Sequence, residues 1–202
     1  MANYEYIISS LPALAPDWKF GEGASFDSYV SWIKSQLGTS DSGTVDFLLR
    51  GFDERGLDKE FYETALSDRS RFIRDFFTFD LHFRNTKARF LNKSIGMPVD
   101  SDTLDIAAGE FPEEEKLEGI LACPDLLERE RKLDALKWDK IDELTRFNYF
   151  DMDSVLGFLA RLQIIDRWFK LDEETGRDMF RQLVDELRST AGEVRYVAPK
   201  DE

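Results

Sequence analysis

The sequence predicts an all-α protein, an elongated multi-helix bundle with two long antiparallel helical hairpins. Three observations predict this class. Apolar residues recur at helical spacing through most of the chain, and little beyond its two ends resembles a strand. The stretch from Ser67 to Met97 contains no proline, so it can form one uninterrupted helix. Residues 126–146 are heavily charged, and charge pairs four residues apart support a second long helix there.

The first third of the chain predicts short helices separated by loops. Residues 4–8 are compatible with a short strand or with the start of a helix, and a loop with several prolines and glycines follows them. Ser25 is a suitable N-cap for the next helix, and Gly38 is well placed to end it. Further short helices are expected over 44–50 and after Asp58.

A register of phenylalanines predicts the longest helix, from about Asp68 to Ser94. Its members are spaced alternately by four and three residues, as on a helix packed lengthwise against another. They are Phe72, Phe76, Phe79 and Phe83, continued by Thr86 and Phe90. At ~1.5 Å per residue such a helix is ~40 Å long.

The second half of the chain predicts three further helices of ordinary or greater length. The first opens after Pro124 and runs to about Arg146. Asp151 or Asp153 then caps a strongly apolar helix, and a last helix begins at Asp172. The tail after this helix is expected to be loose, with one short extended segment.

These elements predict a single helical domain over 1–202. A looser stretch at 97–111, followed by a short acidic helix at 113–121, divides the pattern. We therefore expect two sub-bundles, at about 1–96 and 112–192, joined by that loop.

Composition excludes several function classes. The net charge of −14 repels phosphate backbones and anionic lipid headgroups, so we expect no nucleic-acid partner. No run of ~20 apolar residues and no signal-peptide pattern is present, which predicts a cytoplasmic protein without direct membrane insertion. A single cysteine, Cys123, excludes an intrachain disulfide and suits a reducing compartment.

Motifs for catalysis are absent. The sequence has no glycine-rich phosphate loop, no GxSxG elbow and only one histidine, His82, which lies inside the longest predicted helix. No motif supplies that histidine with a nucleophile, and no metal-ligand spacing is present. We therefore expect no catalytic residue, cofactor or metal site. An enzyme with an unfamiliar carboxylate or metal site remains a third alternative.

The polar residues of the longest helix form the best candidate interaction site. Asp80, Arg84 and Lys87 follow helical spacing on one side, and two asparagines lie seven residues apart. This side is interpreted either as a solvated face or as a face that binds a neighbour. The candidate partner-binding residues are Asp80, Arg84, Asn85, Lys87, Arg89, Asn92 and Lys93. Charge reversal at Arg84 or Lys87 is expected to disturb assembly before folding.

Two segments carry a family resemblance. YEYIISSLPAL and FYETALSDRSRFIRDFFTFDLHFRNTKARFLNKSIG resemble a bacterial family of uncharacterised proteins encoded beside V-type ATPase subunits, and this resemblance covers most of the chain. The pattern D-x-x-x-x-N-x-K-x-R, which starts at Asp80 and is followed by Asn92-Lys93, is similar to helices of the C-subunit of V/A-type ATPases. The eukaryotic counterpart of that protein is known as the d-subunit. The second resemblance is concentrated in residues 61–96.

The resemblance implies a non-catalytic coupling role. The C-subunit is an all-helical, three-part funnel that seats the central rotor shaft on the membrane ring of proteolipids. This chain is shorter than a usual C-subunit, which implies a reduced socket or an accessory of the complex. The implied partners are the central shaft and the proteolipid ring, with a location peripheral to the inner membrane. The alternative is a stand-alone helical scaffold or regulatory protein, for which a homodimer is one form.

Overall fold

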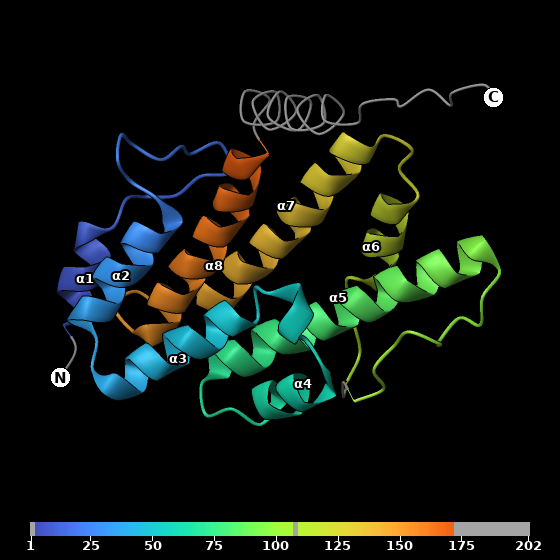
Figure 1. The fold of residues 1–202 in the computed structure, drawn as a ribbon, viewed down its shortest axis with the longest axis horizontal. Helices are drawn as coiled ribbons and strands as arrows, with labels where there is room; N and C mark the ends of the chain where they lie inside the picture. The colour runs from blue at the N-terminus through green and yellow to red at the C-terminus, as the bar shows by residue number, and fades with distance from the viewer. Residues whose placement is uncertain (1–2, 107–108, 172–202) are drawn as a thin grey trace, which may run out of the picture.

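The computed structural model describes residues 3–106 and 109–171, and these residues form helices and loops without a strand (Figure 1). The all-α prediction is confirmed for this part of the chain. Its α-helices are α1 Tyr4–Ser10, α2 Phe26–Gln36, α3 Thr39–Arg50, α4 Lys59–Leu66, α5 Arg71–Ile95, α6 Glu114–Leu121, α7 Leu126–Thr145 and α8 Met152–Lys170. A 3-10 turn, η1, covers Glu54–Gly56. The helix expected from Asp172 and the tail lie outside the described residues.

Side-chain caps fix where several helices begin. Ser25 and Ser28 form a reciprocal capping box at α2, and Asp151 caps α8 through the Ser154 amide. Asn3 caps α1, so residues 4–8 form a helix. Gly38 is the N-cap of α3, which consequently starts five residues earlier than the expected 44–50.

The longest helix, α5, has 25 residues and agrees closely with the predicted 68–94. Its C-terminal Gly96 has φ +72°, a conformation that glycine adopts without strain, and the Met97 amide then donates to the Asn92 carbonyl at 2.9 Å. The phenylalanine register is buried, except for the partly exposed Phe90. In the described part of the chain, no helix combines the length and the apolar run needed to cross a bilayer.

The two long helices α7 and α8 form an antiparallel hairpin (Figure 1). Gly157 permits their close approach, because a Cβ built there would lie 2.5 Å from Cγ2 of Thr145. An ion pair between Arg161 and Asp142 bridges the same region. α5 packs against both helices of the hairpin and against its short sequence neighbours α4 and α6.

Two apolar clusters form the core, and α5 and α7 contribute to both. The larger cluster combines α1–α4 and α8 with the C-terminal half of α7 and with five residues of α5, which are Phe72, Ile73, Phe76, Phe77 and Leu81. The smaller one combines Phe79 and Phe83 with α6 and the N-terminal half of α7. The two cores therefore meet along α5 and α7, and the division into sub-bundles at 97–111 stays a prediction.

Candidate functional site

Five charged residues meet where α5, α7 and α8 pack together. They are Asp80, Arg84, Asp134, Lys137 and Arg167, which we call the inner polar cluster. They line a cavity of about 100 Å³ whose other walls are mostly apolar. Such a concentration of charge inside a helical bundle needs compensating contacts, because burying an unpaired charge is costly.

Asp80 connects α5 to α4. Only 7% of this residue is exposed, and its Oδ2 accepts hydrogen bonds from the Tyr62 hydroxyl at 2.7 Å and from Nε of Arg84 at 2.8 Å. The Arg84 contact is also an ion pair between residues four apart on one helix. The carboxylate charge of Asp80 is therefore compensated within the fold.

Asp134 connects α7 to α8. Its Oδ2 accepts from the Trp168 indole at 2.7 Å and from Nη2 of Arg167. Nη1 of Arg167 donates to Glu130 at 3.0 Å, whereas its Nε is buried without a hydrogen-bond partner among the described residues. Burial by itself would lower the pKa of Arg167, but Asp134 and Glu130 outweigh it and raise that pKa above its ordinary value.

Lys137 differs from the other cations of the cluster. No hydrogen bond or ion pair links its ammonium to any residue that the structure describes, and its Nζ lies 4.9 Å from the centre of the Phe83 ring. Burial lowers the pKa of Lys137, an effect that Asp80 and Asp134 oppose and that Arg84 and Lys87 reinforce. Lys137 therefore has bonding capacity that the fold leaves unused.

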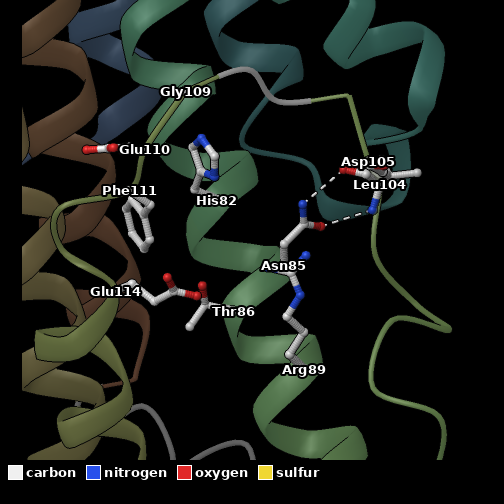
Figure 2. A pocket seen from close by; sticks show the side chains of 10 residues that line it. All are labelled: His82, Asn85, Thr86, Arg89, Leu104, Asp105, Gly109, Glu110, Phe111 and Glu114. Carbon is white, nitrogen blue, oxygen red and sulfur yellow. Dashed lines mark hydrogen bonds between the residues drawn. The ribbon is translucent and has the colours of Figure 1, made fainter.

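A second cavity, of about 400 Å³, lies between α5, the loop before α6, and α6 itself (Figure 2). The His82 ring stacks on Phe111 at a centroid distance of 5.3 Å, and its Nε2 is buried without a hydrogen-bond partner among the described residues. Asn85 closes one side, because its amide donates to the Leu104 carbonyl at 2.9 Å and accepts from the Leu104 amide at 3.0 Å. This cavity is larger than the first and carries more carboxylates.

Neither cavity contains a recognisable metal centre. Within residues 3–106 and 109–171, no group of three or more His, Cys, Asp or Glu side chains is arranged to hold a metal ion. Cys123 lies in the turn between α6 and α7, with its thiol 3.7 Å from a carboxylate oxygen of Glu128.

A family model described as "Protein of unknown function (DUF2764)" matches residues 52–191. The chain belongs to this family. No curated protein and no solved structure matches the chain. Within the described residues, the DUF2764 match spans α4 to α8 and includes the whole inner polar cluster and both asparagines of α5.

Within this DUF2764 region, three of the candidate partner-binding residues of α5 are buried and bonded inside the chain. Asp80 belongs to the inner polar cluster, and Asn85 holds the loop before α6. Asn92 donates to the Val99 carbonyl and to the Ser101 hydroxyl, both at 3.2 Å. The heptad spacing of the asparagines thus marks a side of α5 that the chain itself covers.

The remaining candidates reach toward solvent to different degrees. Arg84 pairs with Asp80, and Arg89 donates to Asp100 at 2.8 Å. Lys87 and Lys93 have exposed side chains. A partner-binding role for the set stays a prediction, and these two lysines are its most accessible members.

Sequence reasoning missed Asp134, Lys137 and Arg167. They lie among other charged residues of α7 and α8. In such segments the spacing of the charged residues does not show which charges are buried and which are solvated. The only signal was local, since Asp134 and Lys137 alternate with Leu133, Leu136 and Trp138, which are all buried. A pattern of this kind indicates burial of the helix but does not identify which charges are buried with it.

The turn between α7 and α8 exposes three large aromatic residues. The exposed fractions are 84% for Phe147, 69% for Tyr149 and 55% for Phe150. We call these three residues the aromatic turn. Aromatic residues are enriched at the centres of protein interfaces, so this turn of the DUF2764 chain is a candidate contact surface.

Proposed function

We propose that this protein is a non-catalytic component of a V-type ATPase, similar to the C-subunit, which couples the central rotor shaft to the membrane proteolipid ring in ATP-driven ion transport. The observation that carries the proposal is a double resemblance. YEYIISSLPAL and residues 61–96 resemble an uncharacterised family encoded beside V-type ATPase subunits, and residues 61–96 are also similar to helices of the C-subunit. The all-helical architecture supports it, because the C-subunit is built from helices alone.

The bracing of α5 also supports a coupling role. A part that transmits torque must resist bending. Hydrogen bonds from buried polar side chains hold α5 to neighbouring segments at three positions along its length. Asp80 bonds to Tyr62 of α4, while Asn85 and Asn92 bond to the loop that follows α5. Leaving a buried polar group without its partner costs ~1–3 kcal/mol, so each bond opposes local deformation.

The aromatic turn supplies a surface for the proposed contact. Phe147 and Tyr149 are the most exposed large apolar residues of the described part of the chain. Truncation of a few aromatic side chains removes most of the binding energy of many interfaces. The net charge of −14 would favour encounter with basic surfaces of the shaft or of the ring.

Affinity capture of the tagged full chain from membranes of its native host tests this function. The expected result is recovery of the shaft and ring subunits of the ATPase. The double variant Phe147→Ser/Tyr149→Ser should lose them. Leu91→Ser is the matched control, because Leu91 is also exposed, by 58%, but lies in α5. Capture without any ATPase subunit would refute the proposal.

A stand-alone scaffold or regulatory protein is the second candidate. The aromatic turn also favours this function, because an exposed apolar surface can be covered by a second copy of the chain. Light scattering on the purified chain, together with the affinity capture, distinguishes the scaffold from the ATPase component. A stable dimer that Phe147→Ser dissociates, together with no capture of ATPase subunits, would favour the scaffold, and a strict monomer would exclude its dimeric form.

A further inference from the structure

We propose that the cavity lined by the inner polar cluster binds one short-chain carboxylate anion, held by Lys137 and Arg167 between α5, α7 and α8. Such a site goes beyond the coupling function and does not depend on it. Three features carry it, namely the pairing of the charges, the lining of the cavity and the size of the cavity.

The cavity lining has more cations than carboxylates, so one cation has no carboxylate partner in the lining. Arg84 is bonded to Asp80, and Arg167 is bonded to Asp134. A further carboxylate, Glu130, bonds to Nη1 of Arg167, but it is partly exposed and does not line the cavity. The lining itself therefore has three cations and two anions.

Lys137 is the cation of the lining that is not paired with a carboxylate there. Its ammonium has no carboxylate within ion-pair distance among the described residues, and Lys137 is partly exposed. An anion in the cavity would supply this ammonium with the counterion that the described residues do not supply. Nε of Arg167, which is buried without a partner among the described residues, is a second unused donor beside the same cavity.

The lining and the volume restrict the kind of anion. The apolar walls are formed mainly by Phe76, Phe79, Ile141, Ala160 and Ile164. The volume of about 100 Å³ exceeds one water, at ~30 Å³ in the liquid, and is well below the ~300 Å³ of small drug-sized pockets. A monocarboxylate with a short hydrocarbon chain satisfies both limits, since its charge meets the ammonium and its chain meets the apolar wall. A phosphate has no apolar part to place there.

Calorimetry on the full chain with sodium butyrate tests this site. We expect saturable binding of one butyrate, and no binding of the neutral analogue butyramide. Binding should also raise the pKa of Lys137, which NMR of its ¹⁵N-labelled side chain measures directly. No binding of butyrate at millimolar concentration, or no change in that pKa on saturation, would overturn the proposal.

Two variants test whether Lys137 binds the butyrate. Lys137→Met should weaken butyrate at least about tenfold, the loss expected for one hydrogen bond to a charged group. Lys87→Met is the matched control, because Lys87 is an exposed lysine that influences Lys137 without lining the cavity. Equal affinity in Lys137→Met and the wild type would contradict the assignment, as would tighter binding of inorganic phosphate than of butyrate.

Discussion

The Tyr62 hydroxyl donates a 2.7 Å hydrogen bond to the buried Oδ2 of Asp80, and this bond joins α4 to the middle of α5. Nε of Arg84 donates to the same oxygen, so one carboxylate oxygen accepts two hydrogen bonds. The contact lies at the meeting point of the two apolar cores. It explains how the packed side of α5 accommodates an aspartate.

Asp80→Ala should destabilise the fold by about 3 kcal/mol, because it removes the acceptor that Arg84 and the Tyr62 hydroxyl share. The free energy of unfolding in urea measures the effect. Asp75→Ala is the matched control, since Asp75 pairs with Arg71 at the surface of the same helix. Exposed pairs contribute ~0–1 kcal/mol, so equal losses in the two variants would show that Asp80 is not a bracing residue.

Gly157→Ala should destabilise the α7–α8 hairpin by about 1–3 kcal/mol, although alanine favours helices. Its Cβ would lie 2.5 Å from Thr145, whose hydroxyl is fixed by a 2.8 Å bond to the Ile141 carbonyl. Gly119→Ala in α6 meets open space and should stabilise by up to about 1 kcal/mol. Thermal unfolding of both variants checks the pair, and a stabilised Gly157→Ala would mean that the helices adjust freely.

Lys137→Met should make the unliganded chain more stable at neutral pH, by about 1 kcal/mol, because it removes a partly buried cation that has no ion-pair partner among the described residues. Burial lowers the pKa of Lys137 below its ordinary 10.5, so the unfolded chain binds more protons than the folded one in this range. Stability is therefore lost as the pH falls from 10.5 through the folded-state pKa.

Urea unfolding across this pH range tests the assignment. The wild type should lose more stability than Lys137→Met as the pH falls, and Lys87→Met should behave like the wild type. Parallel pH profiles for the wild type and Lys137→Met would show that Lys137 is solvated in both states.

Charge reversal at Arg84 and at Lys87 should have different consequences. The sequence-based expectation that both disturb assembly before folding is revised for Arg84, because Arg84 pairs with buried Asp80. Arg84→Glu places a second carboxylate beside buried Asp80 and should destabilise the fold by several kcal/mol, on the order of the ~3–5 kcal/mol of a broken buried pair. Lys87→Glu changes an exposed side chain and should leave unfolding within about 0.5 kcal/mol of the wild type. Circular dichroism during denaturation measures both, and normal unfolding of Arg84→Glu would contradict the structural role of the Asp80 pair.

The helices themselves were largely predictable from the sequence. Ser25 and Asp151 are caps with recognisable chemistry, and the spacing from Phe72 to Phe83 marks the buried side of α5. Gly38 was harder, because a glycine after an apolar run is compatible with the end of one helix and with the cap of the next.

The candidate site was less predictable, for a physical reason. Asn85 and Asn92 do lie on one side of α5, but whether a loop, a partner or water meets that side depends on how residues 97–106 fold back. The charge of Lys137 likewise gives no sign of its burial, because a long side chain can reach solvent from many positions on a helix.

The most direct test of the coupling function places a photo-cross-linking amino acid at position 147, in the aromatic turn, of the chain expressed in its native host. Mass spectrometry then identifies the cross-linked partner, with position 91 as the control. The coupling proposal predicts cross-links from position 147 to the central shaft or to the proteolipid ring of the V-type ATPase. Cross-links only to a second copy of the chain, or to proteins outside that complex, would contradict it.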